Sequence, residues 1–166
     1  MVPEFNWKLT TNSVVFCLYA ALQKTIEAFG GIDILCNNAG ILNESQWEKT
    51  VSINLMGVVR VTYLALEHMN IQPGGVFGVI VLLKSPSGLG PLLSCPIYTA
   101  TKHGVVSFTR AMAAVSTVSG YGMRINAVCR GPVQTDLFSN ILNRLGQFSH
   151  LAGVVQKVSD ITGVLK

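Results

Sequence analysis

Apolar residues along the chain follow two alternating patterns, which predict helices and strands in turn. Amphipathic spacing, with an apolar residue every three or four positions, marks three segments and predicts three helices. They cover residues 13–29, 47–69 and 96–119. Short, almost wholly apolar runs alternate with these segments and are typical of strands in a parallel sheet that is covered on both faces. They cover residues 32–36, 76–83 and 123–129.

Breaks in these patterns fall where helix ends are expected. Gly30-Gly31 ends the first helix, Pro73-Gly74-Gly75 the second and Gly120-Tyr121-Gly122 the third. Pro96 lies at the first helical position of the third, where its missing N–H is not needed. Beyond the third strand the pattern weakens to a short helix near 137–145 and a mixed tail. Helix and strand thus alternate three times, which predicts an α/β fold with a parallel sheet and helices on both faces.

Polar residues follow each predicted strand directly. Asn37–Gly40 comes after the first strand, Ser85 after the second and Arg130–Thr135 after the third, and Tyr98 opens the helix beyond the loop that contains Ser85. Ligands of open parallel sheets bind in the crevice at the carboxyl ends of the strands. The order of the elements therefore brings these residues to one edge of the sheet, where a ligand site is expected.

Tyr98 and Lys102 are four residues apart in the first turns of the predicted helix, so their side chains lie one above the other. An ammonium close to a phenol favours the phenolate and lowers a pKa that is otherwise about 10. Such a phenol can take a proton from an alcohol near neutral pH. The same pair also occurs by chance on many helices. Its place at the carboxyl edge of the sheet favours a functional site over an ordinary surface pair.

The composition excludes several classes of protein. The chain has 166 residues, of which 49% are apolar and 12% charged. This is enough for one domain with a core, and too apolar for disorder. The longest apolar runs are far shorter than a membrane span. The net charge of +4 comes from scattered lysines and arginines, and without a basic stripe it does not indicate a nucleic-acid partner.

The four cysteines and three histidines are widely spaced. There is no Cys-x-x-Cys and no cysteine–histidine cluster at ligand spacing, so no metal site is expected. Cys36 and Cys129 lie in strand-like runs, which predicts buried free thiols in a reducing compartment. The apolar stretch 13–22 could imitate a signal peptide, but its amphipathic spacing continues through Ile26 and Phe29 and favours a helix. We therefore expect a cytoplasmic protein.

Four ordered motifs resemble the short-chain dehydrogenase/reductase family. They are Asn37-Asn38-Ala39-Gly40 after an apolar strand, Asn54 within Ile-Asn-Leu, Ser85 thirteen residues before Tyr98, and Tyr98-x-x-x-Lys102. The similarity runs from about residue 31 to 137, and segments 47–50, 53–55 and 102–110 are most similar to the NAD-dependent 15-hydroxyprostaglandin dehydrogenases of the family. The resemblance implies a doubly wound, Rossmann-like parallel sheet. It also implies an oxidoreductase that transfers a hydride from a secondary alcohol, of the 15-hydroxyprostaglandin or hydroxy-fatty-acid kind, to a nicotinamide cofactor.

The resemblance implies a role for each matching residue. Tyr98 would be the general base that takes the hydroxyl proton, and Lys102 would keep the tyrosine in its low-pKa form and bind the nicotinamide ribose. Ser85 would hydrogen-bond the substrate oxygen, and Asn54 would hold a water that links Lys102 to solvent. Cys95 would join Ser85 and Tyr98 in contacting the substrate.

Three further positions would face the cofactor, for which NAD is expected and NADP is not excluded. Asn38 would lie beside the dinucleotide, while Val133 and Thr135 would contact its carboxamide and phosphate region. Plain structural interpretations exist as well, because Asn38 can cap a turn, Ser85 a loop and Thr135 the short helix that follows it.

The sequence also departs from the family. Family members begin with a strand, a Thr-Gly-x-x-x-Gly-x-Gly turn and a helix that together cradle the pyrophosphate, and this turn and the first strands are missing here. Residues 1–166 are therefore expected to form a single incomplete Rossmann-type domain, with a shortened tail at 138–166. Arg130 stands where the family usually has proline, and Lys84 adds a cation beside Ser85. The strand at 32–36 would be left as an open edge, which predicts poor solubility.

Two alternatives to an active dehydrogenase remain open. The helices at 47–69 and 97–119 resemble those through which the family dimerises. The chain could thus be a catalytically silent partner that forms a homo-oligomer or pairs with full-length paralogues. The sequence could also be an incomplete gene model of an active enzyme. The retained residues indicate a dehydrogenase, whereas the missing phosphate cradle argues against turnover by the chain as it stands.

Overall fold

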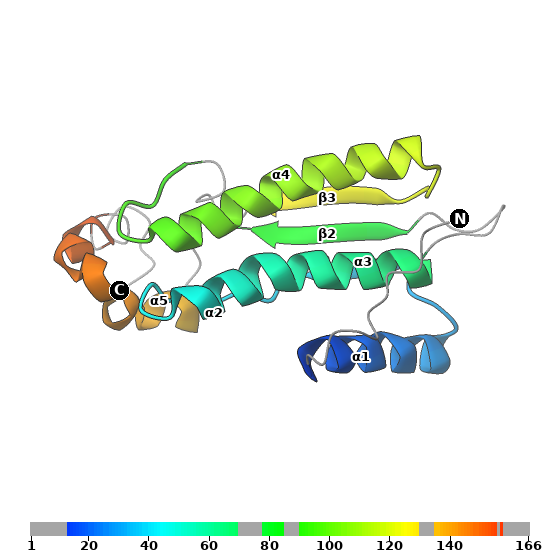
Figure 1. Cartoon of the computed structure of the whole chain (residues 1–166), viewed down its shortest axis with the longest axis horizontal. Helices are drawn as coiled ribbons and strands as arrows, with labels where there is room; N and C mark the ends of the chain where they lie inside the picture. The colour runs from blue at the N-terminus through cyan, green and yellow to red at the C-terminus, as the bar shows by residue number, and fades with distance from the viewer. Residues whose placement is uncertain (1–12, 70–77, 85–89, 130–134, 156, 158–166) are drawn as a thin grey trace.

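The computed structural model describes residues 13–69, 78–84, 90–129, 135–155 and 157 of the chain. Helices and strands alternate along them, as the apolar spacing predicts (Figure 1). The larger elements are α1 (Ser13–Phe29), β1 (Ile34–Asn37), α2 (Trp47–Val51), η2 (Ser52–Gly57), α3 (Val58–Met69), β2 (Val79–Lys84), α4 (Pro96–Val118) and β3 (Arg124–Cys129). Three short helices follow, namely α5 (Asp136–Ser139), η4 (Ile141–Arg144) and η5 (Gly146–Leu151).

The three strands form a parallel sheet in the order β1-β2-β3. Leu35 of β1 pairs with Ile80 of β2, and Ile80 pairs with Ile125 of β3. Parallel neighbours need crossover connections, and the α2–α3 segment and α4 supply them here. The carboxyl ends of the strands therefore lie at one edge of the sheet, and the predicted α/β fold with a partial parallel sheet is confirmed.

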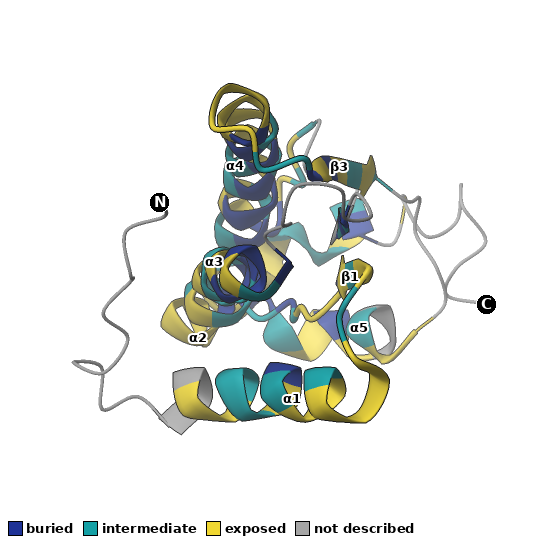
Figure 2. Ribbon diagram, turned by 90° about the vertical axis from the view of Figure 1, so that its right-hand side faces the viewer, coloured by how far each residue is buried: buried dark blue, intermediate teal, exposed yellow. Residues whose placement is uncertain are grey.

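The helices α3 and α4 lie over the same face of the sheet (Figure 2), and α1 packs against α3. Their apolar sides meet the strands in one core. Its buried members are Val58, Ala65, Leu66, Met69, Ile80, Leu82, Val105, Met112, Met123 and Ile125. Removing this apolar surface from water is the main favourable contribution to the stability of such a fold.

The opposite face of the sheet is open in the part of the chain that the structure describes. The side chains of Ile34 and Val128 are 63% and 47% exposed, and those of Cys36, Arg124 and Asn126 are exposed as well. The prediction that the first and third strands are covered on both faces is therefore wrong. Because successive side chains of a strand point to opposite faces, a helix layer on one face leaves every second side chain of these strands uncovered.

The prediction of buried thiols in the strands is wrong for Cys36 and only partly met by Cys129. Cys17 and Cys36 are exposed, Cys129 is half-buried and Cys95 is buried, and all four are free. Cys36 is exposed because it lies on the open face of β1. An apolar run in the sequence thus does not ensure burial where the described part of the chain covers only one face of the sheet.

The segment predicted as one helix from Trp47 to Met69 is continuous but not uniform. Its middle part, η2, is a π-helix of six residues between α2 and α3, and the residues at both junctions keep right-handed helical dihedral angles. Such widened turns inside α-helices are frequent at functional sites. Asn54, a predicted site residue, lies in this turn and is fully buried.

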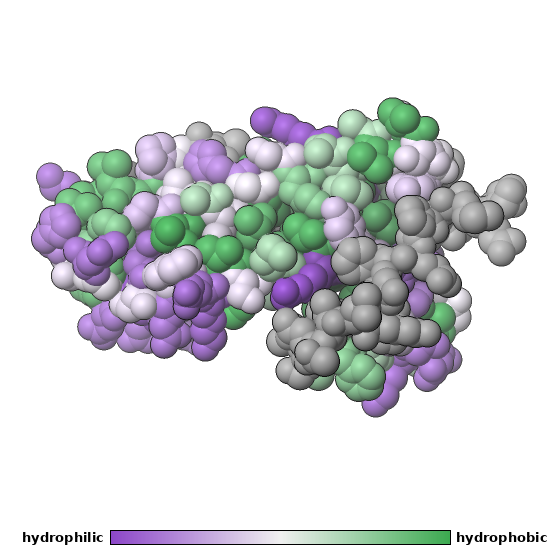
Figure 3. Space-filling view, viewed as in Figure 1, coloured by the Kyte–Doolittle hydropathy of each residue, from purple (hydrophilic) through white to green (hydrophobic). Residues whose placement is uncertain are grey.

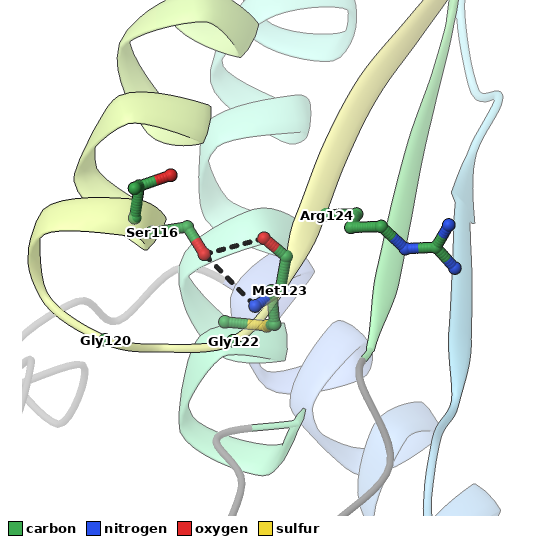
Figure 4. Close-up of a pocket in the computed structure, with 6 residues that line it drawn as sticks. Ser116, Gly120, Gly122, Met123 and Arg124 are labelled. Carbon is green, nitrogen blue, oxygen red and sulfur yellow. Dashed lines mark hydrogen bonds between the residues drawn. The ribbon is translucent and has the colours of Figure 1, made fainter.

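The turn from α4 to β3 is closed by Ser116 at the amino end of the sheet (Figure 4). The Ser116 hydroxyl donates to the carbonyl of Met123 at 2.7 Å and accepts from the Met123 N–H at 3.2 Å. Gly120 and Gly122 have φ angles of 67° and 66°, which glycine adopts without strain. These residues line a shallow hollow of about 490 Å³ together with Thr117 and Arg124. Because β3 begins here, the hollow lies at the edge opposite the predicted site.

In its described residues the tail contains the short helices α5, η4 and η5, where the sequence predicted one helix near 137–145. Ile141 and Leu145 are buried there, and they pack in a second cluster with Leu42, Cys95, Tyr98 and Val155. The tail therefore forms one wall around Tyr98. Among the helices that the structure describes, none has the length and apolar character needed to cross a membrane.

Candidate active site

Tyr98 and Lys102 lie in the first turns of α4, at the carboxyl edge of the sheet. Both side chains are buried, with 3% and 7% of their surfaces exposed. The Lys102 Nζ lies 5.3 Å from the centroid of the Tyr98 ring. A cation at this distance from an aromatic ring is attracted by it. The structure thus brings the predicted pair together at the predicted edge.

Gly40 allows Lys102 and Asn54 to approach the turn after β1. A Cβ atom at Gly40 would lie 3.2 Å from the Nζ of Lys102 and 3.4 Å from the Oδ1 of Asn54. Real Cβ contacts are rarely this tight. The bare backbone of Gly40 therefore lets residues from three separate elements lie against one another.

Asn54 holds the chain just after this glycine. Its Oδ1 accepts from the N–H of Ile41 at 2.8 Å, and its Nδ2 donates to the carbonyl of Ile41 at 2.8 Å. The Nδ2 also donates to the Oγ1 of Thr101 at 3.3 Å. The amide of Asn54 is thus engaged with the loop after β1 and with α4, one residue before Lys102.

The two asparagines of the Asn37-Asn38 pair have different surroundings. Asn37 is buried, and its Nδ2 donates to the carbonyl of Val58 at 3.2 Å, which ties the end of β1 to α3. Asn38 is exposed at the carboxyl edge, and Thr135 is exposed at the start of the tail. Asn37 therefore has a structural role, and Asn38 is the one of the pair that is accessible to a ligand.

Sequence reasoning missed Glu44, which caps α4 from a distance. Its Oε2 accepts from the N–H of Ile97 at 3.1 Å and its Oε1 accepts from the N–H of Tyr98 at 2.9 Å. The local sequence does carry a signal, because neither Cys95 nor Pro96 supplies a side-chain cap for a long helix. A helix start without a local cap needs partners from elsewhere, but linear spacing does not say which residue provides them.

Cys95 precedes α4 and is fully enclosed in the second cluster. Burial raises the pKa of its thiol to about 11; a hydrogen bond with Ser94 opposes this and the charge of Glu44 adds to it. The thiol is therefore protonated and not nucleophilic at neutral pH. Contact of Cys95 with a substrate would need this cluster to open, and it stays a prediction.

Other predicted positions lie outside the described residues. These are Ser85, Val133 and Arg130, and of Lys84 only the backbone is described. Within the part of the chain that is described, no group of three or more His, Cys, Asp or Glu side chains could hold a metal ion. Among the described residues, the site therefore consists of Tyr98, Lys102, Asn54 and Gly40, with Glu44 at the start of α4.

The fold and this edge define a parallel α/β protein with a tyrosine–lysine pair at the carboxyl ends of its strands. The model of the short chain dehydrogenase family matches residues 17–145, and the chain belongs to this family. The resemblance carried by the four motifs is thereby confirmed.

Several relatives share most of this chain. It is 40% identical over 145 residues to 15-hydroxyprostaglandin dehydrogenase [NAD(+)] of Homo sapiens, an alignment that covers 86% of this chain and 54% of the human protein. It is 37% identical over 123 residues to an oxidoreductase of Thermotoga maritima, covering 69% of this chain and 47% of that protein. The chain therefore spans about half the length of the curated relatives it matches.

A solved structure supports the same assignment. The crystal structure of a protein described as a short-chain alcohol dehydrogenase from Sinorhizobium meliloti 1021 matches with a TM-score of 0.65 at 30% identity. The match covers 73% of this chain and 49% of that one. The part of the fold that is present thus follows the family, and the match leaves about half of that chain without a counterpart here.

Proposed function

We propose that this chain carries the alcohol-oxidising residues of a short-chain dehydrogenase that transfers a hydride from a secondary alcohol to NAD. The observation that supports this most strongly is the buried pair of Tyr98 and Lys102, with 5.3 Å between the Lys102 Nζ and the ring centroid. The 40% identity to a human protein named as an NAD(+)-dependent 15-hydroxyprostaglandin dehydrogenase supports both the cofactor and the class of alcohol.

In the proposed reaction, Tyr98 takes the proton of the substrate hydroxyl while the carbon gives up its hydride. Lys102 favours the phenolate form of Tyr98 because of its positive charge, and Ser85 hydrogen-bonds the substrate oxygen. Asn54 assists the passage of the proton from Lys102 toward solvent. When bound, NAD supplies the hydride acceptor.

The described residues that would meet the cofactor lie around the turn after β1. The bare backbone of Gly40 lies against Lys102 and Asn54, which holds the ammonium at this turn, near the exposed Asn38. We propose Lys102, Asn38 and Tyr98 as the cofactor's neighbours on this side, and Val133 and Thr135 on the other. The sequence contains no Thr-Gly-x-x-x-Gly-x-Gly turn for the phosphates, so a low affinity is expected.

A cofactor titration tests this proposal. The chain is incubated with NAD or NADP and with a prostaglandin-type or a hydroxy-fatty-acid alcohol, and reduced cofactor is followed by absorbance. Any turnover should depend on NAD and be lost in Tyr98→Phe. The matched control is Tyr121→Phe, at the amino end of β3, which should keep the activity. Full turnover by Tyr98→Phe would contradict the mechanism, and no binding at millimolar NAD would contradict the proposal for this chain.

A second function is favoured by the apolar surface of the helices. Trp47, Met56, Tyr63 and Val115 are exposed on α2, η2, α3 and α4. Tyr63 of α3 contacts Phe108 of α4 edge-to-face, with 6.0 Å between the ring centroids, and apolar residues gather on the face that these helices form (Figure 3). Such a surface is typical of an interface. The chain would then act as a partner in a homo-oligomer or with a full-length paralogue.

Light scattering distinguishes these functions. A dimer that dissociates in Tyr63→Glu, while Glu67→Gln stays dimeric, supports the interface on α3 and α4. Co-purification with a full-length paralogue, without NAD binding by the chain alone, supports a silent partner. A monomer at all concentrations contradicts homo-oligomer formation.

A further inference from the structure

We propose that Glu44 is a positioning residue for Tyr98, acting on the backbone of α4 and not on the substrate. The inference rests on the proposed function, because it concerns the placement of the proposed base. It assigns a reason for an acidic side chain that no sequence motif explained.

Glu44 supplies the acceptors that the start of α4 lacks. The first N–H groups of a helix have no partner within the helix. Pro96 has no N–H, and Cys95 makes no side-chain cap. The N–H groups of Ile97 and Tyr98 therefore point out of the helix, and each is bound by one oxygen of Glu44, at 3.1 and 2.9 Å. Hydrogen bonds to a carboxylate are stronger than neutral ones, and a negative charge is favourable at a helix N-terminus.

Glu44 is itself held in place. Only 6% of its surface is exposed, and a buried carboxylate is costly unless it is hydrogen-bonded. Its backbone N–H donates to the carbonyl of Arg144 at 2.7 Å. The preceding carbonyl, of Asn43, accepts from the Oγ1 of Thr50 at 2.7 Å. The carboxylate is thus carried by a segment that is fixed to the tail and to α2.

The backbone carbonyl of Tyr98 is also bound, as its N–H is by Glu44. Its carbonyl accepts from the Oγ1 of Thr101 at 2.7 Å, and that Oγ1 accepts from the Nδ2 of Asn54 at 3.3 Å. The backbone on both sides of the proposed base is therefore bound by side chains. Because displacing a reacting group by about 1 Å can cost about a hundredfold in rate, this placement bears directly on the proposed reaction.

The test uses Glu44→Gln, with the exposed Glu48→Gln of α2 as the matched control. The glutamine has the same length, but its NH₂ group faces one of the two N–H donors and cannot accept. Tyrosine labelled with ¹³C at Cζ reports the ionisation of Tyr98 by NMR without any cofactor. Cys95 lies in the same cluster and has a pKa raised by burial to about 11, so the titration is done in a Cys95→Ala background.

We expect Glu44→Gln to fold and its Tyr98 titration midpoint to rise by about 0.5 pH unit or more, because the phenol is held less well against Lys102. Adding Lys102→Met to both forms should remove the rise. In the alcohol assay, kcat should fall about tenfold with little change in KM, since a shifted base affects the transition state. Glu48→Gln should change none of these values.

Loss of a nearby negative charge alone would lower the midpoint. A lowered or unchanged midpoint in Glu44→Gln therefore overturns the inference, as does a rise that persists in Lys102→Met. If Glu44→Gln does not fold, Glu44→Asp, which keeps the charge but is one methylene shorter, is measured by the same criteria. A native chain without turnover counts against the proposed function, while the NMR titration still decides whether Glu44 positions Tyr98.

Discussion

Asn54 binds both backbone polar groups of Ile41, accepting from its N–H and donating to its carbonyl, each at 2.8 Å. A side-chain amide that mimics a neighbouring strand in this way holds the loop after β1 against the π-helical turn η2. The same amide reaches Thr101 on α4. Asn54 is therefore a structural link between three elements of the site, in addition to the proton-transfer role proposed for it.

Asn54→Ala should destabilise the fold strongly. It leaves the N–H and the carbonyl of Ile41 without their partner, and each unsatisfied buried group costs about 1–3 kcal/mol. We expect the free energy of unfolding in urea to fall by about 2–4 kcal/mol. The exposed Asn143→Ala is the control and should change it by less than about 0.5 kcal/mol. A loss below about 1 kcal/mol for Asn54→Ala would show that the loop does not depend on this link.

Gly40→Ala should disturb the site through one added methyl group. That group would lie 3.2 Å from the Lys102 Nζ and 3.4 Å from the Asn54 Oδ1, and such overpacking costs about 1–3 kcal/mol. We expect a matching fall in the free energy of unfolding, together with weaker alcohol oxidation. Gly153→Ala has no atom within 4 Å of its new methyl and should leave stability unchanged or slightly higher. Equal stabilities of the two variants would contradict the close approach at Gly40.

Cys95 should make the fold less stable at alkaline pH. Burial raises its folded pKa from the ordinary value of 9.0 to about 11, so the neutral thiol is favoured in the folded state. The thiol's contribution to the free energy of unfolding is present below the pKa of the unfolded thiol. It is lost as the pH rises toward 11, because the unfolded chain releases the proton first. We expect the free energy of unfolding to fall less between pH 8 and pH 10.5 in Cys95→Ala than in the native chain.

The reactivity of the thiols provides an independent check on the burial of Cys95. Iodoacetamide at pH 8 should modify the exposed Cys17 and Cys36 quickly and Cys95 only on unfolding. Peptide mass spectrometry locates the label. Rapid labelling of Cys95 in the folded chain would be inconsistent with its burial.

Ser116→Ala should weaken the turn at the far end of α4 without affecting the site. In the native chain the Ser116 hydroxyl oxygen lies 3.2 Å from the backbone N of Met123 and 2.7 Å from its carbonyl oxygen. Alanine removes both hydrogen bonds, so the free energy of unfolding should fall by about 1–3 kcal/mol. Ser107→Ala, on the exposed side of α4, is the control. The Tyr98 titration should stay the same in both variants, and a shift in Ser116→Ala would show that the two ends of α4 are coupled.

Ile34→Lys should improve solubility. In the described part of the chain β1 pairs only with β2, and Ile34 lies on the open face with 63% of its surface exposed. Open apolar edges pair with other chains, and lysine on an edge prevents this. Size-exclusion chromatography should show less aggregate for Ile34→Lys than for Leu142→Lys, which removes an apolar residue of η4 that is 48% exposed. A native chain that is monodisperse at high concentration would contradict the prediction.

Much of the fold could be predicted because its signals are local. The 3.6-residue period of apolar positions follows from the geometry of a single helix and located α1 and α4, and short apolar runs located the three strands. The parallel sheet and the shared edge of its strand ends follow from the alternation of helices and strands, whereas the strand order came from the structure. The i, i+4 spacing of Tyr98 and Lys102 is also local, so their proximity was expected from the sequence.

The remaining features depend on residues that are far apart in the chain. Glu44 meets Tyr98 across 54 positions, and Asn54 meets Thr101 across 47; no periodicity encodes such contacts. The exposure of Ile34 and Cys36 depends on whether a second layer covers the sheet. The sequence by itself determined the elements and the proposed catalytic pair, because backbone geometry is local. Only the tertiary structure decided what holds the tyrosine in place, because the cap of α4 comes from a separate loop that folding brings to it.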